Sequence, residues 1–258
     1  MMKQAVKDST LTLCALGALA CMVQSVLHEG LGHGVTAWLS GAHTITVSSV
    51  AMDADIDSRW IDAAGTFVNL AAAALLWIAL RLVRRGSATV RYLLVLMFAG
   101  NLFAGTGYFL FSGFAGFGDW NQIIQGLHPY WLFRVGLVVA GVIGYAVSMV
   151  LVARELRPFA QDRQRLKKLT WTPYFAEAAL AAFAGLFNPA GPILVLLSAL
   201  PATMGANSGL LWIRHYVAPP VEADEASGIG RSYAWGGAAF ALAIAFIFFV
   251  GRGLTWHR

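Results

Sequence analysis

Three ionisable side chains are crowded into one apolar stretch near the N-terminus. His28, Glu29 and His33 lie within six residues, and the chain is apolar on both sides of them. Each ionisable side chain inside a membrane-spanning helix costs at least about 2.5–3.5 kcal/mol. A bound cation is a suitable partner for two imidazoles and a carboxylate. We therefore predict a metal site here. A proton relay, or a hydrogen-bonded polar cluster between spans, is the alternative.

The spacing of the two histidines constrains the helix that carries them. In the usual zinc helix, H-E-x-x-H, the histidines are four residues apart and the glutamate activates water. Here His28 and His33 are five apart, which puts them about 140° apart around a regular helix. A π-helical turn of roughly 4.4 residues would reduce that angle to about 50°. Gly30 and Gly32 make the backbone permissive,. We expect a π-turn or a helix break at 29–33, with Glu29 as general base.

A catalytic zinc site needs a third protein ligand and one open position. Asp119 is the best candidate, because it is the only acid between Asp62 and Glu155 and follows the third apolar run. Glycines at 113, 116 and 118 would let the chain turn back toward the first run,. The alternative is an ordinary solvated loop aspartate.

The composition indicates an integral membrane protein. The chain is 58% hydrophobic and 12% charged, against about 25% charged residues in soluble domains,. We expect a single integral membrane domain, 1–258, of the all-α polytopic class, with a short β element after the first span. A crossing helix needs about 20 apolar residues. Six runs qualify: 11–38, 61–81, 92–112, 132–153, 174–200 and 233–251. Pro189 and Pro192 should break or kink the fifth run,.

The basic residues indicate an orientation. Of the 18 lysines and arginines, 14 lie in the N-terminal tail, the 81–91 and 154–168 linkers and the C-terminal tail. Short basic linkers stay in the cytoplasm, so six spans with both termini cytoplasmic fit the pattern. We expect a bacterial inner membrane. The net charge of +5 is explained by these flanking residues, so the lipid bilayer and not nucleic acid is the expected partner.

At this point the sequence resembles the site-2 protease family of intramembrane zinc metalloproteases. The run His28-Glu29-Gly30-Leu31-Gly32-His33 is similar to the family's H-E-x-G-H with one inserted residue. The run Ala64-Gly65-Thr66-Phe67-Val68-Asn69 is similar to its Gly-Pro-x-x-Asn signature, and Asp119 stands in place of its Asp-Gly ligand.

The resemblance implies a fold and a set of roles. It makes His28, His33 and Asp119 ligands of Zn²⁺, Glu29 the general base and Asn69 a substrate-binding residue near the oxyanion. It implies a metalloprotease core at 10–120, further transmembrane helices at 121–258, and a transmembrane protein as substrate. The alternating run 43–48 resembles the family's edge strand, which would pair with an unwound substrate. A plain hairpin is the alternative.

Two other functions compete with peptide hydrolysis. Intramembrane ionisable residues and broken helices are also typical of transporters. A transporter should show a polar pathway to both sides and internal symmetry between halves. An inactive, protease-like scaffold would keep the His/Glu cluster as a proton or metal site without cutting anything.

Overall fold

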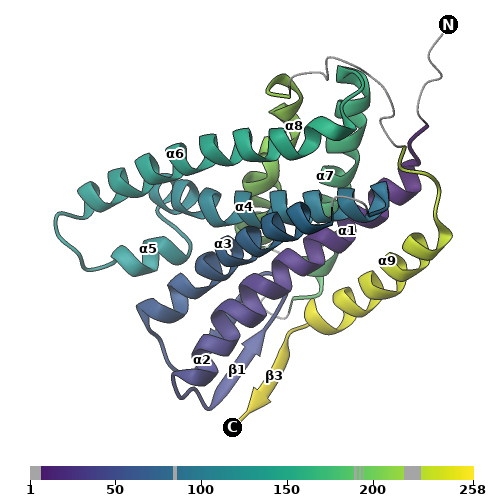
Figure 1. Ribbon diagram of the computed structural model, residues 1–258. Coiled ribbons are helices and arrows are strands. Elements are labelled where there is room, and N and C mark those ends of the chain that lie inside the picture. Colours follow the sequence, from purple (N-terminus) through teal and green to yellow (C-terminus); the bar gives the residue numbers. More distant parts are fainter. Residues whose placement is uncertain (1–6, 84–85, 189–190, 192, 194, 218–227) are drawn as a thin grey trace, which may run out of the picture.

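The computed structural model describes residues 7–83, 86–188, 191, 193, 195–217 and 228–258. It is a bundle of long helices with a small β-sheet at one end (Figure 1). The helices in the first half are α1 Thr10–Ser25, the π-helix η1 Val26–Gly34, α2 Val35–Leu39, α3 Arg59–Leu82, α4 Ala88–Ala115 and α5 Asp119–Ile124. The later ones are α6 Tyr130–Leu156, η2 Arg157–Phe159, α7 Arg163–Leu186, η3 Val195–Ala199, η4 Pro201–Gly205, η5 Ala206–Ser208, α8 Gly209–Trp212, η6 Ile213–His215, α9 Tyr233–Ala245 and η7 Phe246–Val250. The strands are β1 Thr44–Val47, β2 Met52–Ala54 and β3 Leu254–His257.

Five helical stretches of the described chain are long and apolar enough to cross a membrane. They are Thr10–Leu39, Arg59–Leu82, Ala88–Ala115, Tyr130–Phe159 and Tyr233–Val250. Large apolar side chains are exposed along them, among them Leu75, Val139 and Phe240, which is where lipid would cover a membrane protein. The predicted class, an all-helical membrane protein with a small β element, is confirmed. Six spans were predicted, whereas five stretches of the described chain qualify.

The fifth predicted span, 174–200, is where the difference arises. In the structure α7 runs parallel to α1, with Arg165 bonded to Asp8 at one end and the Cys21 thiol 3.8 Å from the carbonyl oxygen of Glu177 further along. The broken segment 195–215 then runs back beside α7. The predicted span 174–200 therefore combines the end of α7 with the start of a second, antiparallel pass. Neither pass reaches the length and hydropathy of the five membrane-spanning stretches given above.

The extra pass changes where the chain ends. The backbone N–H of Ile229 bonds to Asp8, and that of Ser49 bonds to the carbonyl oxygen of Val250, so α9 runs from the N-terminal end of the bundle to the sheet end. The start of α1 and the C-terminal strand β3 lie at opposite ends of the molecule (Figure 1). This arrangement does not support the prediction that both termini share one side of the membrane.

The sheet has the order β2-β1-β3 and is antiparallel throughout. The predicted strand at 43–48 is confirmed as β1, but both of its edges are paired. Thr46 lies opposite Asp53 of β2 and Thr255 of β3. The expectation that this strand offers a free edge is wrong, because the C-terminal strand occupies it. The free edge on the hairpin side of the sheet belongs to β2.

Close packing of η1 against α3 sets the position of the histidines. A Cβ atom on Gly32 would lie 2.5 Å from the Cα of Gly65, so the two backbones touch without side chains between them. A Cβ on Gly65 would lie 2.4 Å from Nε2 of His33 and 2.7 Å from Nε2 of His28. Glycine at both positions is therefore required for α3 to pass directly beneath the two imidazoles.

Candidate metal centre

The chain adopts π-helical geometry over Val26–Gly34, and this brings the two histidines together. The prediction of a π-turn at 29–33 is confirmed. The ring centroids of His28 and His33 are 4.8 Å apart, and both residues are buried. A regular helix would direct the rings about 140° apart. The wider π turn is thus the local feature that makes a shared site geometrically feasible.

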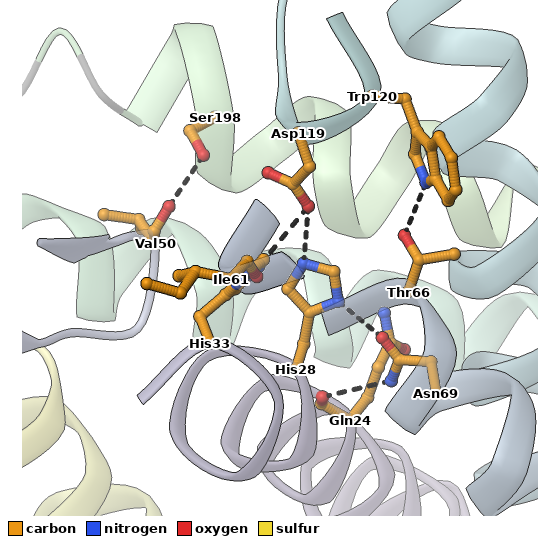
Figure 2. Close-up of polar contacts among 10 residues, drawn as sticks. All are labelled: Gln24, His28, His33, Val50, Ile61, Thr66, Asn69, Asp119, Trp120 and Ser198. Atoms are coloured by element: carbon orange, nitrogen blue, oxygen red, sulfur yellow. Dashed lines mark hydrogen bonds and ion pairs between the residues drawn. The ribbon is translucent and has the colours of Figure 1, made fainter. Parts of the chain in front are cut away.

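Asp119 reaches the same point from the other side of the bundle (Figure 2). Its Oδ2 lies 3.1 Å from Nε2 of His28 and 3.4 Å from Nε2 of His33. Tetrahedral zinc with bonds of about 2.0–2.1 Å places its ligand atoms roughly 3.4 Å apart. One ligand atom from each of the three residues lies within 4.8 Å of the others. The predicted set of His28, His33 and Asp119 is therefore brought together at a spacing that a small ion fits.

The loop that carries Asp119 depends on two glycines and a tryptophan. Gly116 and Gly118 have φ values of 66° and 90°, a region that other residues rarely adopt. The indole N–H of Trp120 donates to Oγ1 of Thr66 on α3, at 2.9 Å. This bond ties the start of α5 to the helix that passes beneath the histidines, and so fixes Asp119 above them.

Each imidazole is oriented by a partner on its far nitrogen. Nδ1 of His33 lies 2.6 Å from the carbonyl oxygen of Ile61, which can only accept, so Nδ1 carries the proton,. Nδ1 of His28 lies 2.5 Å from Oδ1 of Asn69. The amide nitrogen of Asn69 donates to Oδ1 of Asn101 at 2.7 Å, which leaves its oxygen to accept from His28. This arrangement is the usual outer shell of a metal-binding histidine.

These hydrogen bonds fix the tautomers of both imidazoles, and with those tautomers the centre has no positive charge to balance the Asp119 carboxylate. With a proton on each Nδ1, the neutral imidazoles of His28 and His33 both present a lone pair at Nε2. These lone pairs converge on the Asp119 carboxylate, so three acceptors face one another in a largely buried space. A cation, or protons taken up by the imidazoles, must balance them. When the imidazoles take up these protons they donate to Asp119 and hold its pKa below the usual value, against burial, which alone would raise that pKa.

A cavity of about 220 Å³ opens beside the three ligands. Glu29, His33 and Asp119 line it together with Tyr108 and the chain at 50–52, which leads into β2. A smaller inner cavity of about 40 Å³ is lined by His28 and Glu29 as well. Glu29 therefore lines both cavities, one shared with His33 and Asp119 and the other with His28, which suits a general base that must reach water next to the ion,.

Asn69 has a different place from the one that the resemblance implied. Its side chain is fully buried, and its amide groups are engaged by His28, Asn101 and the carbonyl oxygen of Gln24. In this arrangement it has no group left for a substrate. Asn69 is thus a positioning residue for His28.

Two polar residues of the site were not predicted. Asn101 supports Asn69, and Tyr108 stacks on His28 with ring centroids 4.6 Å apart. Tyr108 lines both the main cavity and the inner one. Both residues are polar groups inside the apolar run 92–112, as are Tyr92, Thr106 and Ser112. That contrast was the available signal, because polar groups in a span usually have a function.

The broken segment after α7 also reaches the site. Oγ of Ser198 donates to the carbonyl oxygen of Val50 at 2.8 Å, next to the cavity (Figure 2). The proline-containing break predicted in the fifth run falls on residues 189 and 192, which lie outside the described chain, as do 190 and 194. Within the described residues, Ser198 does line the cavity.

Comparison of the chain with models of protein families, with curated proteins and with solved structures finds no match.

Proposed function

We propose that this protein is a membrane-embedded zinc metalloprotease that cuts a peptide bond of a membrane or membrane-proximal protein. The observation that carries the proposal is the convergence of His28, His33 and Asp119, each histidine held by a hydrogen bond on its other nitrogen. Two imidazoles and one carboxylate with a free position are the donor set of catalytic zinc. The runs 28–33 and 64–69 resemble two motifs of the site-2 protease family and occur in the same order along the chain, which supports the same function.

The residues around the ion site fit peptide hydrolysis. A zinc ion bound there would polarise the scissile carbonyl and acidify its water. Glu29 accepts the proton from the attacking water and later delivers it to the leaving amine. Tyr108, which lines the cavity, offers a hydroxyl that could donate to the oxyanion,. The second ring nitrogens stay protonated throughout, because Asn69 and the Ile61 carbonyl hold them.

The substrate must be extended where it is cut, since an intact helix hides its carbonyl groups. The chain at 50–52 lines the cavity and leads directly into β2, and β2 is an edge strand in the order β2-β1-β3. An unwound substrate can add to such an edge through main-chain hydrogen bonds. We therefore assign strand addition to β2, in place of the β1 edge that is already paired.

The charges of the described residues support an orientation. Eleven basic residues lie at the N-terminal end of the bundle: Lys7, Arg81, Arg91, Arg154, Arg157, Arg163, Arg165, Lys167, Lys168, Arg214 and Arg231. Four lie at the sheet end: Arg59, Arg134, Arg252 and Arg258. The positive-inside rule then places the N-terminal end in the cytoplasm. The metal centre and the C-terminus face the other side, and a bacterial inner membrane is the compartment we propose.

Two variants separate this enzyme from the alternatives. Glu29→Gln should keep zinc and lose hydrolysis of fluorescein-labelled casein and of a panel of transmembrane peptides, because the ligands remain and the base is gone. Asp57→Asn, an exposed acid at the same end, is the matched control and should cut as the wild type does. If zinc-loaded wild type leaves all these substrates intact, the inactive scaffold is the better account. If the wild-type protein holds no metal, a transporter that uses the histidines as a proton site is the better account.

A further inference from the structure

A basic cavity lies at the N-terminal end of the bundle, far along α1 and α7 from the metal centre. Its volume is about 920 Å³. It is lined by Lys7, Asp8, Asp162, Gln164, Arg165, Lys167, Lys168, Trp171 and Thr172. Four of these side chains are cationic and two are anionic, so the cavity carries an excess of positive charge.

Both anionic side chains are already engaged by the protein. Asp8 accepts from Nε of Arg165 at 2.8 Å and from the backbone N–H of Ile229 at 2.9 Å. Asp162 caps the start of α7 by accepting from the backbone N–H of Arg165 at 2.7 Å. These contacts engage both carboxylates, and in the part of the chain that the structure describes no carboxylate pairs with Lys167.

Trp171, which lines this cavity, also contacts a cation from outside the cavity lining, Arg214. Nζ of Lys167 lies 4.1 Å from the centre of its indole ring, and Cζ of Arg214 lies 5.1 Å from it. The indole N–H donates to the carbonyl oxygen of Leu211 at 3.1 Å. Among the described residues, neither Lys167 nor Arg214 forms an ion pair. One aromatic ring therefore joins α7 to the segment 209–215 and holds two cations that have no ion-pair partner within the described part of the chain.

The depth of Trp171 corresponds to the lipid headgroups. Pro173 contacts Gly17 of α1, so Trp171 lies near the level of residue 15. The stretch Thr10–Leu39 has 30 residues and is about 45 Å long, whereas the hydrocarbon core is about 30 Å thick,. Roughly 7 Å at each end then lies among headgroups. Trp212 and Tyr216, next to Arg214, are exposed at this end, as aromatic side chains at a membrane interface are,.

We propose that this end of the bundle binds the phosphate of an anionic phospholipid of the cytoplasmic leaflet through Lys167 and Arg214, the two cations held against Trp171. A diffusing phosphate would gain the charge interaction alone, whereas a lipid also places its acyl chains along the neighbouring apolar helices. The bound headgroup stabilises the contact of α7 with the segment 195–215. Because Ser198, at the other end of that segment, lines the metal cavity, the lipid also holds one wall of that cavity in place.

Native mass spectrometry and thermal unfolding of the full-length protein test the proposal. The protein is placed in phosphatidylcholine nanodiscs with added phosphatidylglycerol, with phosphatidylcholine alone, or with inorganic phosphate. We expect retained phosphatidylglycerol and a higher Tm in the first condition only. The double variant Lys167→Ala/Arg214→Ala should bind phosphatidylglycerol roughly 30-fold more weakly, the equivalent of about 1 kcal/mol per cation. Lys167→Arg, which keeps the charge, should bind as the wild type does.

The matched control is Arg157→Ala/Arg163→Ala, which removes two exposed cations at the same end that do not line the cavity. It should bind phosphatidylglycerol as the wild type does. Equal loss of lipid in the control, equal retention of phosphatidylcholine, or the same Tm increase with inorganic phosphate would each overturn the proposal. Because the readouts are lipid retention and Tm, they are independent of whether the protein is a protease.

Discussion

Replacing Asn69 with alanine should weaken zinc binding roughly 10–100-fold, the usual effect of losing a partner behind a metal ligand. Oδ1 of Asn69 accepts from Nδ1 of His28 at 2.5 Å in a place with no exposure to solvent. Without that acceptor, binding the ion at Nε2 leaves a buried N–H unsatisfied, at a cost of about 1–3 kcal/mol. At about 1.4 kcal/mol per tenfold change, this corresponds to roughly 5–150-fold in affinity, which agrees with the first range.

The assay is a competition titration of the purified protein, in detergent at pH 7.5, against a chromophoric zinc chelator. Asn207→Ala is the matched control. Asn207 is also a fully buried asparagine between helices, but its amide bonds to Gln24 and Glu177 and does not touch either histidine. We expect the control to keep the zinc affinity of the wild type, even if its Tm falls. Unchanged zinc affinity in Asn69→Ala, or an equal loss in both variants, would refute the role given to Asn69.

Three further outcomes follow from the geometry of the centre. Gly65→Ala should abolish zinc binding, because its Cβ would lie 2.4–2.7 Å from atoms of both imidazoles; Gly237→Ala, where a Cβ meets nothing within 4 Å, should bind zinc normally. Tyr108→Phe should keep zinc and KM and lower kcat about 10²-fold or more, as removal of an oxyanion donor does; an unchanged kcat would exclude that role. Zinc affinity should decline as the pH falls, because protons compete for Nε2 of both histidines, whereas Asp119, with its lowered pKa, stays ionised; an affinity independent of pH between 5 and 8 would contradict this assignment.

The local shape of the metal centre could be predicted from the sequence because its constraints are local. Two histidines five apart cannot share an ion on a regular helix, and two glycines between them permit a π turn, so the π-helix at Val26–Gly34 followed from spacing and sterics alone. Asp119 was identified because no other acid lies near it in the sequence. Its nearness to His28 and His33, however, depended on the resemblance and on the glycines before it.

The features that were missed depend on contacts between distant segments. The edge of β1 is occupied by β3, more than 200 residues away, and no pattern near residue 45 indicates this partner. The antiparallel passes of α7 and 195–215 were read as one span because α7 begins among charged residues and the second pass is broken by proline and glycine. Hydropathy detects lipid-facing helices, and these two segments pack largely against other helices.

The most direct test of the metal centre is the metal content of the purified protein, measured by inductively coupled plasma mass spectrometry for the wild type, His28→Ala and Asp119→Ala. We expect one zinc per chain in the wild type. Folded His28→Ala and Asp119→Ala should contain little or none after brief dialysis against a chelator that leaves the wild type loaded. Wild-type protein without a stoichiometric metal, or the same metal content in all three proteins, would contradict the site described above.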